Sequence, residues 1–290
     1  MAGQGATVGQ AKEEAKHGAR RAQEAVQNPW VERIARLGYI VRGLLYAVIG
    51  WLAVQVAMGT GGATTDKKGA IAAIGSQPAG TVLLIIVVIG LAGYSLWGFI
   101  RAIFDPLNRG KDAKGIAQRI GYVVSGLTYG ALVLFTVQIL MGANSGAQGG
   151  GGNQDLTAKL LSQPWGPWLV GIVGLIGMGG GLGQAYQGIT ADFKKDFKTD
   201  QMDAQELRAA IWVGRFGMIA RGVVFALLGF FLVLAALHVD AKEAKGLDGA
   251  LQTLAQQPYG PWLLGAVALG LVSFGVYSIM CARWVKVIRS

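Results

Sequence analysis

Two arginines lie inside otherwise apolar stretches of this 290-residue chain and are the first candidates for chemistry. Arg42 and Arg221 hold equivalent places in two similar segments. An arginine inside an apolar helix is costly, so it marks a ligand site or a permeation path by default. A structural role remains open, because each lies about 9 Å inside the basic boundary of its segment, within reach of lipid phosphates or helix-end carbonyls. The candidate lipid- or ligand-binding residues are Arg42 and Arg221 with the boundary residues Arg36, Arg119 and Arg215.

A glycine-rich run, "GLIGMGGGLGQAYQG" at 174–188, raises the possibility of a phosphate-binding loop. It lies in the middle of an apolar segment, fits no strict G-x-G-x-x-G register, and lacks the strand–turn–helix context of such loops. Glycines four residues apart instead let two membrane helices approach closely. The predicted helix-packing residues are Gly177, Gly179, Gly181 and Gly183.

Other catalytic signals are weak. The predicted spans contain no Asp, Glu or His, the two histidines lie outside the apolar centres, and Cys281 is the one cysteine. Serines in the spans lack a histidine base, and no Cys-x-x-Cys or His-Glu-x-x-His motif occurs. The sequence therefore predicts no catalytic residues, no metal site and no cofactor, and a protein that is not an enzyme.

The elements that position these residues are six apolar segments. The chain is 52% hydrophobic and only 14% charged, against about 25% charged in an average soluble domain. Uncharged or nearly uncharged runs are long enough to cross a bilayer core of about 30 Å, and they occur near 37–58, 80–103, 120–142, 166–190, 217–237 and 261–282. An all-α integral membrane protein is predicted.

The distribution of basic residues predicts its direction. Nineteen Lys and Arg lie in the N-terminal tail, the 101–119 and 191–215 segments and the C-terminal tail, whereas five lie on the other side. Cytoplasmic loops carry the excess of positive charge, so both termini are expected in the cytoplasm. This topology explains the net charge of +10 without nucleic-acid binding. The expected location is the inner (plasma) membrane, and anionic lipid headgroups are expected partners of the cytoplasmic side.

The chain contains three copies of one two-helix unit. "RLGYIVRGLLY", "RIGYVVSGLTY" and "RFGMIARGVVF" begin the copies, and a Gln-Pro corner before the second helix recurs as "SQPAG", "SQPWG" and "QQPYG". Short helices lying on the outer membrane surface are expected before each corner. The predicted organisation is a charged tail at 1–29, three repeats at 30–105, 115–192 and 212–285, and a charged linker at 193–211 before the third repeat. Matching Gly90, Gly177 and Gly270 requires one extra residue in the middle repeat and sets Gly181 where the others have Tyr94 and Phe274.

The repeated Arg-x-Gly-Tyr-x-x-x-Gly start and the Gln-Pro-x-Gly corner resemble a bacterial family of membrane proteins known as a domain of unknown function, DUF1206. The resemblance covers residues 30 to about 285, and Met218 departs from its tyrosine. It implies three tandem two-helix units and a bacterial source, and it implies no activity. The residues that carry it are Arg36, Gly38, Tyr39 and Gly43, then Arg119, Gly121, Tyr122 and Gly126, then Arg215, Gly217 and Gly222.

Three same-direction units suggest a pseudo-threefold axis along the membrane normal. The first functional hypothesis is a non-enzymatic structural or accessory protein that binds anionic lipid or a membrane-protein partner. The second is a small-solute or ion channel or transporter through the repeat bundle, because internal repeats are common among transporters. A dry core with an apolar side groove would favour the first hypothesis, and a continuous polar path would favour the second.

Overall fold

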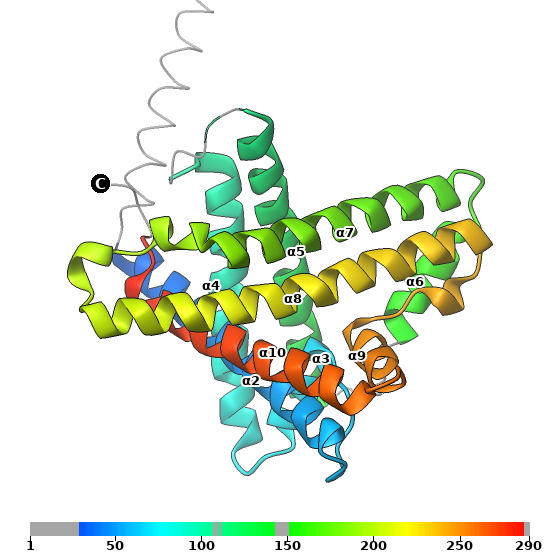
Figure 1. Ribbon diagram of the computed structural model, residues 1–290, viewed down its shortest axis with the longest axis horizontal. Helices are drawn as coiled ribbons and strands as arrows, with labels where there is room; N and C mark the ends of the chain where they lie inside the picture. Colours follow the sequence, from blue (N-terminus) through cyan, green and yellow to red (C-terminus); the bar gives the residue numbers. More distant parts are fainter. Residues whose placement is uncertain (1–28, 107–109, 111, 143–150, 287–290) are drawn as a thin grey trace, which may run out of the picture.

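The computed structural model describes residues 29–106, 110, 112–142 and 151–286, and these fold almost entirely into helices (Figure 1). Six helices are long and apolar enough to cross a membrane, which confirms the predicted spans. They are α2 (Pro29–Ala57), α4 (Gly80–Phe104), α5 (Ala113–Leu140), α7 (Gly166–Thr190), α8 (Ala204–His238) and α10 (Gly260–Trp284). The predicted short helices are α3 (Lys67–Gly75), α6 (Gly151–Leu161) and α9 (Leu247–Ala255). The tail at 1–28 lies outside the described residues.

Each repeat is thus a long helix, a short helix and a second long helix: α2–α4, α5–α7 and α8–α10. Aspartates begin three of these helices, because a carboxylate can accept the free N–H groups of a first helical turn. Asp66 accepts from the Gly69 amide at the start of α3, and Asp112 and Asp203 do the same for α5 and α8. The local sequence therefore fixes where these elements start.

The Gln-Pro corner has the same steric requirement in all three repeats. A Cβ on Gly80, Gly166 or Gly260 would collide with a backbone carbonyl oxygen of the preceding short helix. Glycine lets the chain reverse there without that collision. Each short helix is consequently held against the first turn of the following long helix, at one end of the bundle (Figure 1).

The long helices pack in a cyclic order. The first helix of each repeat packs most closely against the second helix of the repeat before it, with the third repeat preceding the first: α5 on α4, α8 on α7, and α2 on α10. The two helices within the first and third repeats also pack together, whereas the described residues of α5 and α7 in the middle repeat make little or no contact with each other. The packing follows the expected threefold order and forms a ring that is open between α5 and α7.

Small residues make the three interfaces equivalent. A Cβ on Gly43 would lie 2.6 Å from the carbonyl oxygen of Gly275, and a Cβ on Gly222 would lie 2.6 Å from that of Gly181. At the third interface a Cβ on Gly126 would lie 3.2 Å from the oxygen of Ser95. Ser95, Gly181 and Gly275 are each fifteen residues after the glycine that starts their helix. The extra residue expected in the middle repeat is therefore wrong.

This register explains the opening of the ring. Tyr94 packs directly on Gly38 within the first repeat, and Phe274 packs on Gly217 within the third. The equivalent residue of the middle repeat is Gly180, not Gly181, and its own glycine for this contact is Gly121. Nothing lies within 4 Å of a Cβ built on either. The close helix-to-helix contact found within the other two repeats is therefore missing between α5 and α7 in the described residues.

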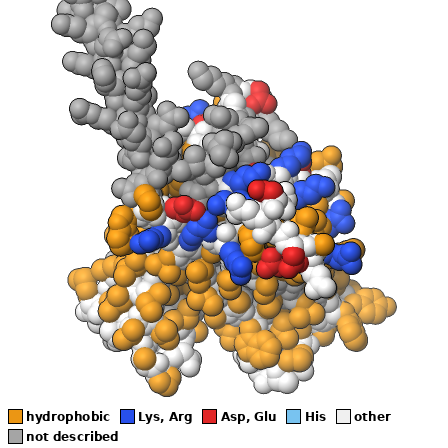
Figure 2. Space-filling view, turned by 90° about the vertical axis from the view of Figure 1, so that its left-hand side faces the viewer, with side chains coloured by type: hydrophobic (Ala, Val, Ile, Leu, Met, Phe, Trp, Pro, Cys, Tyr) orange, Lys and Arg blue, Asp and Glu red, His pale blue; other side chains and the backbone are white. Residues whose placement is uncertain are grey.

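One end of the molecule is basic. Figure 2 shows Lys and Arg side chains gathered over the face on the left of Figure 1, with apolar side chains below them. This face, called the basic end below, carries the start of α8, the end of α10 and the segment between α7 and α8. That segment, expected as a linker, forms the short 3-10 helices η1 (Asp192–Asp196) and η2 (Thr199–Gln201) and continues into α8. Its Phe193 and Phe197 are buried against Tyr277.

Candidate functional site

The boundary arginines bind helix ends. The Nε of Arg119 donates to the carbonyl oxygen of Ala102 at 2.7 Å, in the last turn of α4. Arg36 pairs with Glu32 and donates to carbonyl oxygens at the end of α10, among them that of Arg283 at 2.7 Å. A cation at a helix C-terminus is favoured because the last carbonyls are unpaired and partly negative. Arg119 therefore joins the second repeat to the first, and Arg36 joins the first repeat to the third. Arg215 instead lies 5.8 Å from the ring centre of Trp212, and its Nε has no partner.

Arg42 is turned into the centre of the bundle. Its side chain is buried among aromatic rings, and its carbon Cζ lies 5.0 Å from the ring centre of Tyr39 and 5.1 Å from that of Phe274. Its Nε donates to the hydroxyl of Ser278 at 2.8 Å, and another nitrogen donates to the hydroxyl of Tyr94. All these partners are neutral. The buried charge is thus stabilised by hydrogen bonds and by the negative faces of the rings.

Arg221 contacts the same phenylalanine. Its Cζ is 4.8 Å from the ring centre of Phe274. Its Nε donates to the hydroxyl of Tyr46 at 2.9 Å, and another nitrogen donates to the amide oxygen of Gln184 at 2.8 Å. Gln184 belongs to α7, so this contact ties the glycine-rich helix to the centre. Arg42 and Arg221 are therefore brought together, although their hydrogen-bond partners differ.

Two further cations, Arg101 and Lys67, join this group, and neither is a candidate from the sequence. Arg101, in the last turn of α4, is buried with its Cζ 4.2 Å from the ring centre of Tyr122, and it donates to the hydroxyl of Tyr39. Arg101 falls inside the predicted span 80–103, which could have flagged it. Lys67, the first residue of α3, has its Nζ 4.6 Å from the ring centre of Tyr129. No local signal predicts that contact.

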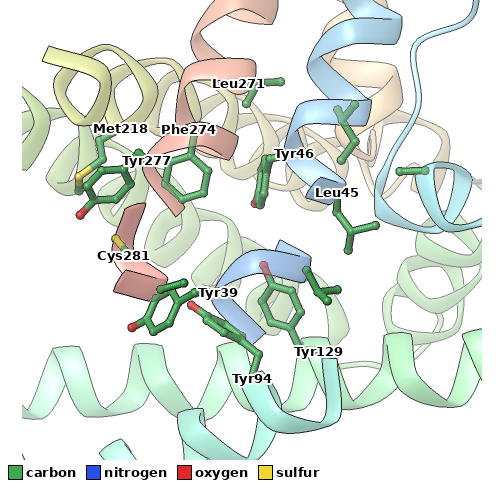
Figure 3. Packing of buried hydrophobic residues seen from close by; sticks show 14 of the residues in the cluster. Tyr39, Leu45, Tyr46, Tyr94, Tyr129, Met218, Leu271, Phe274, Tyr277 and Cys281 are labelled. Carbon is green, nitrogen blue, oxygen red and sulfur yellow. The ribbon is translucent and has the colours of Figure 1, made fainter. Parts of the chain in front are cut away.

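Together these side chains form a connected column of cations and aromatic rings, called the central column below. It extends from Arg101 in the last turn of α4 to Lys67 at the start of α3, near the other end of α4. Figure 3 shows the rings of Tyr46 and Phe274 facing those of Tyr39, Tyr94 and Tyr129 across the centre. The members in order of contact are Arg101, Tyr39, Tyr94, Arg42, Phe274, Arg221, Tyr46, Lys67 and Tyr129.

The predicted packing glycines divide into two pairs. Gly181 is buried against α8, and a Cβ on Gly177 would lie 3.5 Å from the Cα of Gly229, so both face that helix. Nothing lies within 4 Å of a Cβ built on Gly179 or Gly183. These two glycines therefore do not pack against another helix in the described part of the chain, contrary to the expectation for them.

An apolar groove of about 450 Å³ lies between α7 and α8, away from the central column. Its walls include Trp168 and Leu175 of α7 and Leu237 of α8, all exposed. The apolar surface continues over α5 and α7, in which only 22% and 17% of the most apolar window is buried, against 39–50% in the other four long helices. Among the described residues, α5 and α7 are therefore the long helices whose most apolar stretches are least covered by the rest of the chain.

The fold and this column define a multi-pass helical protein made of three two-helix repeats. The model of the family described as Domain of Unknown Function (DUF1206) matches residues 37–105, 120–191 and 216–285, one match for each repeat. The chain belongs to this family, and the resemblance predicted from its motifs is confirmed.

A bacterial relative supports the same assignment. The chain is 37% identical over 254 residues to "Uncharacterized protein YxxB" of Bacillus subtilis (strain 168), which covers 87% of this chain and 90% of the relative. No solved structure matches the chain.

Proposed function

We propose that this protein is a non-enzymatic protein of the bacterial plasma membrane that binds anionic lipid headgroups on its cytoplasmic side, where both termini lie. The observation that carries the proposal is the basic end, where exposed Lys and Arg side chains lie directly above exposed apolar helix faces (Figure 2). Each basic side chain near an anionic membrane surface contributes about 1 kcal/mol of attraction. Exposed cations of this face are Arg33, Lys194, Lys195, Arg208 and Arg283.

The apolar surfaces support the same proposal from the side of the lipid chains. The groove between α7 and α8 and the exposed faces of α5 and α7 offer extended contact to acyl chains. A membrane-protein partner could use the same faces, since helices in a bilayer associate through close packing. The chemistry of the column supports a binding role rather than catalysis, because its polar groups are cations, amides and tyrosine hydroxyls, with no carboxylate or imidazole in the predicted spans to move a proton.

Native mass spectrometry of the full chain, extracted gently from its own membrane, tests this proposal. The wild-type protein should retain anionic lipid, and a Lys194→Gln/Arg208→Gln/Arg283→Gln variant should lose most of it. The matched control is Lys159→Gln/Lys242→Gln, which removes exposed cations from the opposite end. A wild-type protein that carries no lipid, or equal loss in both variants, contradicts the proposal. A retained partner subunit would appear as an additional mass in the same spectrum.

The second candidate function is passage of a small anion through the bundle. The observation that favours it is the central column, whose four cations are linked through shared aromatic rings between the last turn of α4 and the start of α3. Anion pathways are commonly lined by Arg and Lys. Flux of chloride or phosphate into vesicles containing the purified protein tests this candidate. Flux that is abolished by Arg42→Gln and kept by Lys242→Gln would support it, and absence of flux would exclude it.

A further inference from the structure

We infer that the part of the central column around Lys67 and Tyr129 is a binding site for an oxyanion, either a carboxylate or a phosphate. The site lies inside the bundle and uses residues of α3, α5, α7 and α8, so it is distinct from the lipid contact proposed for the basic end. Its four donor residues are Lys67, Tyr129, Gln184 and Arg221.

The positive charge of the central column is not compensated by carboxylates of the described residues. None of the column's four cations forms an ion pair with a carboxylate of the described residues; their partners are rings, hydroxyls, an amide and backbone. Arg42 and Arg101 are buried and Lys67 and Arg221 are half-buried, and cations removed from water are costly unless they are paired. Several uncompensated cations close together also repel one another, and an anion among them would relieve both costs.

Two buried hydrogen-bond donors of the site, on Tyr129 and Gln184, have no acceptor among the described residues. Only 3% of Tyr129 is exposed, and its buried hydroxyl has no hydrogen-bond partner among the described residues. The amide nitrogen of Gln184 is also buried and unpaired, because its oxygen alone is used by Arg221. Buried polar groups are normally satisfied, so unpaired donors indicate a missing acceptor. The Nζ of Lys67 lies over the rings of Tyr129 and Tyr46 without a hydrogen bond among the described residues.

The four donor residues are connected to one another, because Lys67 lies over the rings of Tyr46 and Tyr129 and Arg221 bonds both Tyr46 and Gln184. Figure 3 shows the hydroxyl groups of Tyr46 and Tyr129 directed toward the same space. Arg221 donates to the hydroxyl of Tyr46 and to the amide oxygen of Gln184, so it connects Tyr46 to α7. An oxyanion has several acceptor oxygens and can take separate bonds from an ammonium, a hydroxyl, an amide and a guanidinium. A cation would meet only like charge here.

The opening of the ring bears on where the ligand comes from. Tyr129 is on α5 and Gln184 is on α7, the two helices whose described residues make little or no contact with each other. An anion bound to both would bridge the two halves of the middle repeat. A headgroup attached to an acyl chain would enter from the membrane between these helices, whereas a free anion would enter from water past Lys67 at the start of α3.

The test is isothermal titration calorimetry on the full-length protein, freed of lipid by detergent exchange, at low ionic strength. The two probes are octanoate, a carboxylate with an acyl chain, and inorganic phosphate. Tyr129→Phe should weaken binding by about tenfold, the effect of losing one hydrogen bond to a charged group, and Lys67→Gln should weaken it at least as much. Tyr129→Phe removes only an unpartnered hydroxyl, so its folding should be unimpaired.

The matched control is Tyr277→Phe, another buried tyrosine, whose ring packs on Phe193 and Phe197. It should bind both probes as the wild type does. Tighter binding of octanoate would assign the ligand to the membrane, and tighter binding of phosphate would assign it to water. Binding of neither probe, or binding unchanged in Tyr129→Phe and Lys67→Gln, overturns the inference. The basic-end variant Lys194→Gln/Arg208→Gln/Arg283→Gln should keep this binding, which separates the two proposals.

Discussion

The substitution Gly181→Ala tests the packing of α7 on α8 with a single added methyl group. A Cβ at this position would lie 2.6 Å from the carbonyl oxygen of Gly222 and 2.9 Å from the carbonyl carbon of Phe225, whereas ordinary contact begins at 3.4 Å. The atoms that it would meet are backbone, so they cannot turn away as a flexible side chain would. The two helices would have to separate by most of an ångström.

The expected cost follows from two opposing effects. Overpacking a tight interface costs about 1–3 kcal/mol. Replacing a helical glycine by alanine returns up to about 1 kcal/mol through helix propensity. Gly181→Ala should therefore lower the free energy of unfolding by about 1–2 kcal/mol. Gly183→Ala, two residues away on the same helix with nothing within 4 Å, should leave it unchanged or raise it by up to about 1 kcal/mol.

The assay is thermal unfolding of each purified variant in the same detergent, followed by intrinsic tryptophan fluorescence. Gly181→Ala should unfold a few degrees below the wild type, and Gly183→Ala at the wild-type temperature or above it. Equal shifts for the two variants would show that helix propensity alone decides, and the close approach of α7 and α8 would then be refuted.

Three further predictions concern the polar groups that hold the repeats together. Arg119→Gln should lower the free energy of unfolding by about 1–2 kcal/mol, because it loses bonds to the end of α4. Arg215→Gln should lower it less, since the Nε of Arg215 has no partner. The midpoints of unfolding in denaturing detergent compare the two variants. Ser278→Ala should cost about 1–3 kcal/mol by leaving the Nε of Arg42 without an acceptor, and the same assay should rank it above Ser273→Ala, whose hydroxyl is exposed and bonds only within its own helix. Burial raises the pKa of Asp66 above 3.8, so the folded protein binds that proton more tightly and stability should fall as pH rises through this higher pKa; Asp66→Asn should remove this component from a series of melting temperatures against pH.

Much of the fold is readable along the chain because each signal is local. Six spans follow from runs of apolar residues that a bilayer core requires, and the three copies follow from the repeated Arg-x-Gly start and the Gln-Pro corner. The pairing of helices is not local. Gly222 contacts Gly181, whereas Gly180 does not contact Gly121. These pairings depend on a register of one residue along α7, and its run of glycines leaves that register ambiguous in the sequence.

The candidate site was predicted in part for the same reason. Arg42 and Arg221 stand out because a charge within an apolar run is visible in any sequence. Lys67 is one of the five basic residues that the sequence places on the outer side. Its contact with the centre of the bundle depends on how α3 folds back over α2 and α5. Arg36 and Arg119 were candidates for ligand binding, and only the positions of the neighbouring helix ends show that they bind carbonyls.

Six helices long and apolar enough to cross a membrane, arranged as three related units, can be predicted from the sequence, because hydrophobic length and internal repetition are properties of the chain read in order. Which arginines bind helix ends and which meet in the centre follows only from how the helices pack. The same packing decides that the ring opens between α5 and α7. The physical reason is that hydrogen bonds and ring contacts act over a few ångströms, between residues such as Arg42 and Ser278 that stand 236 positions apart.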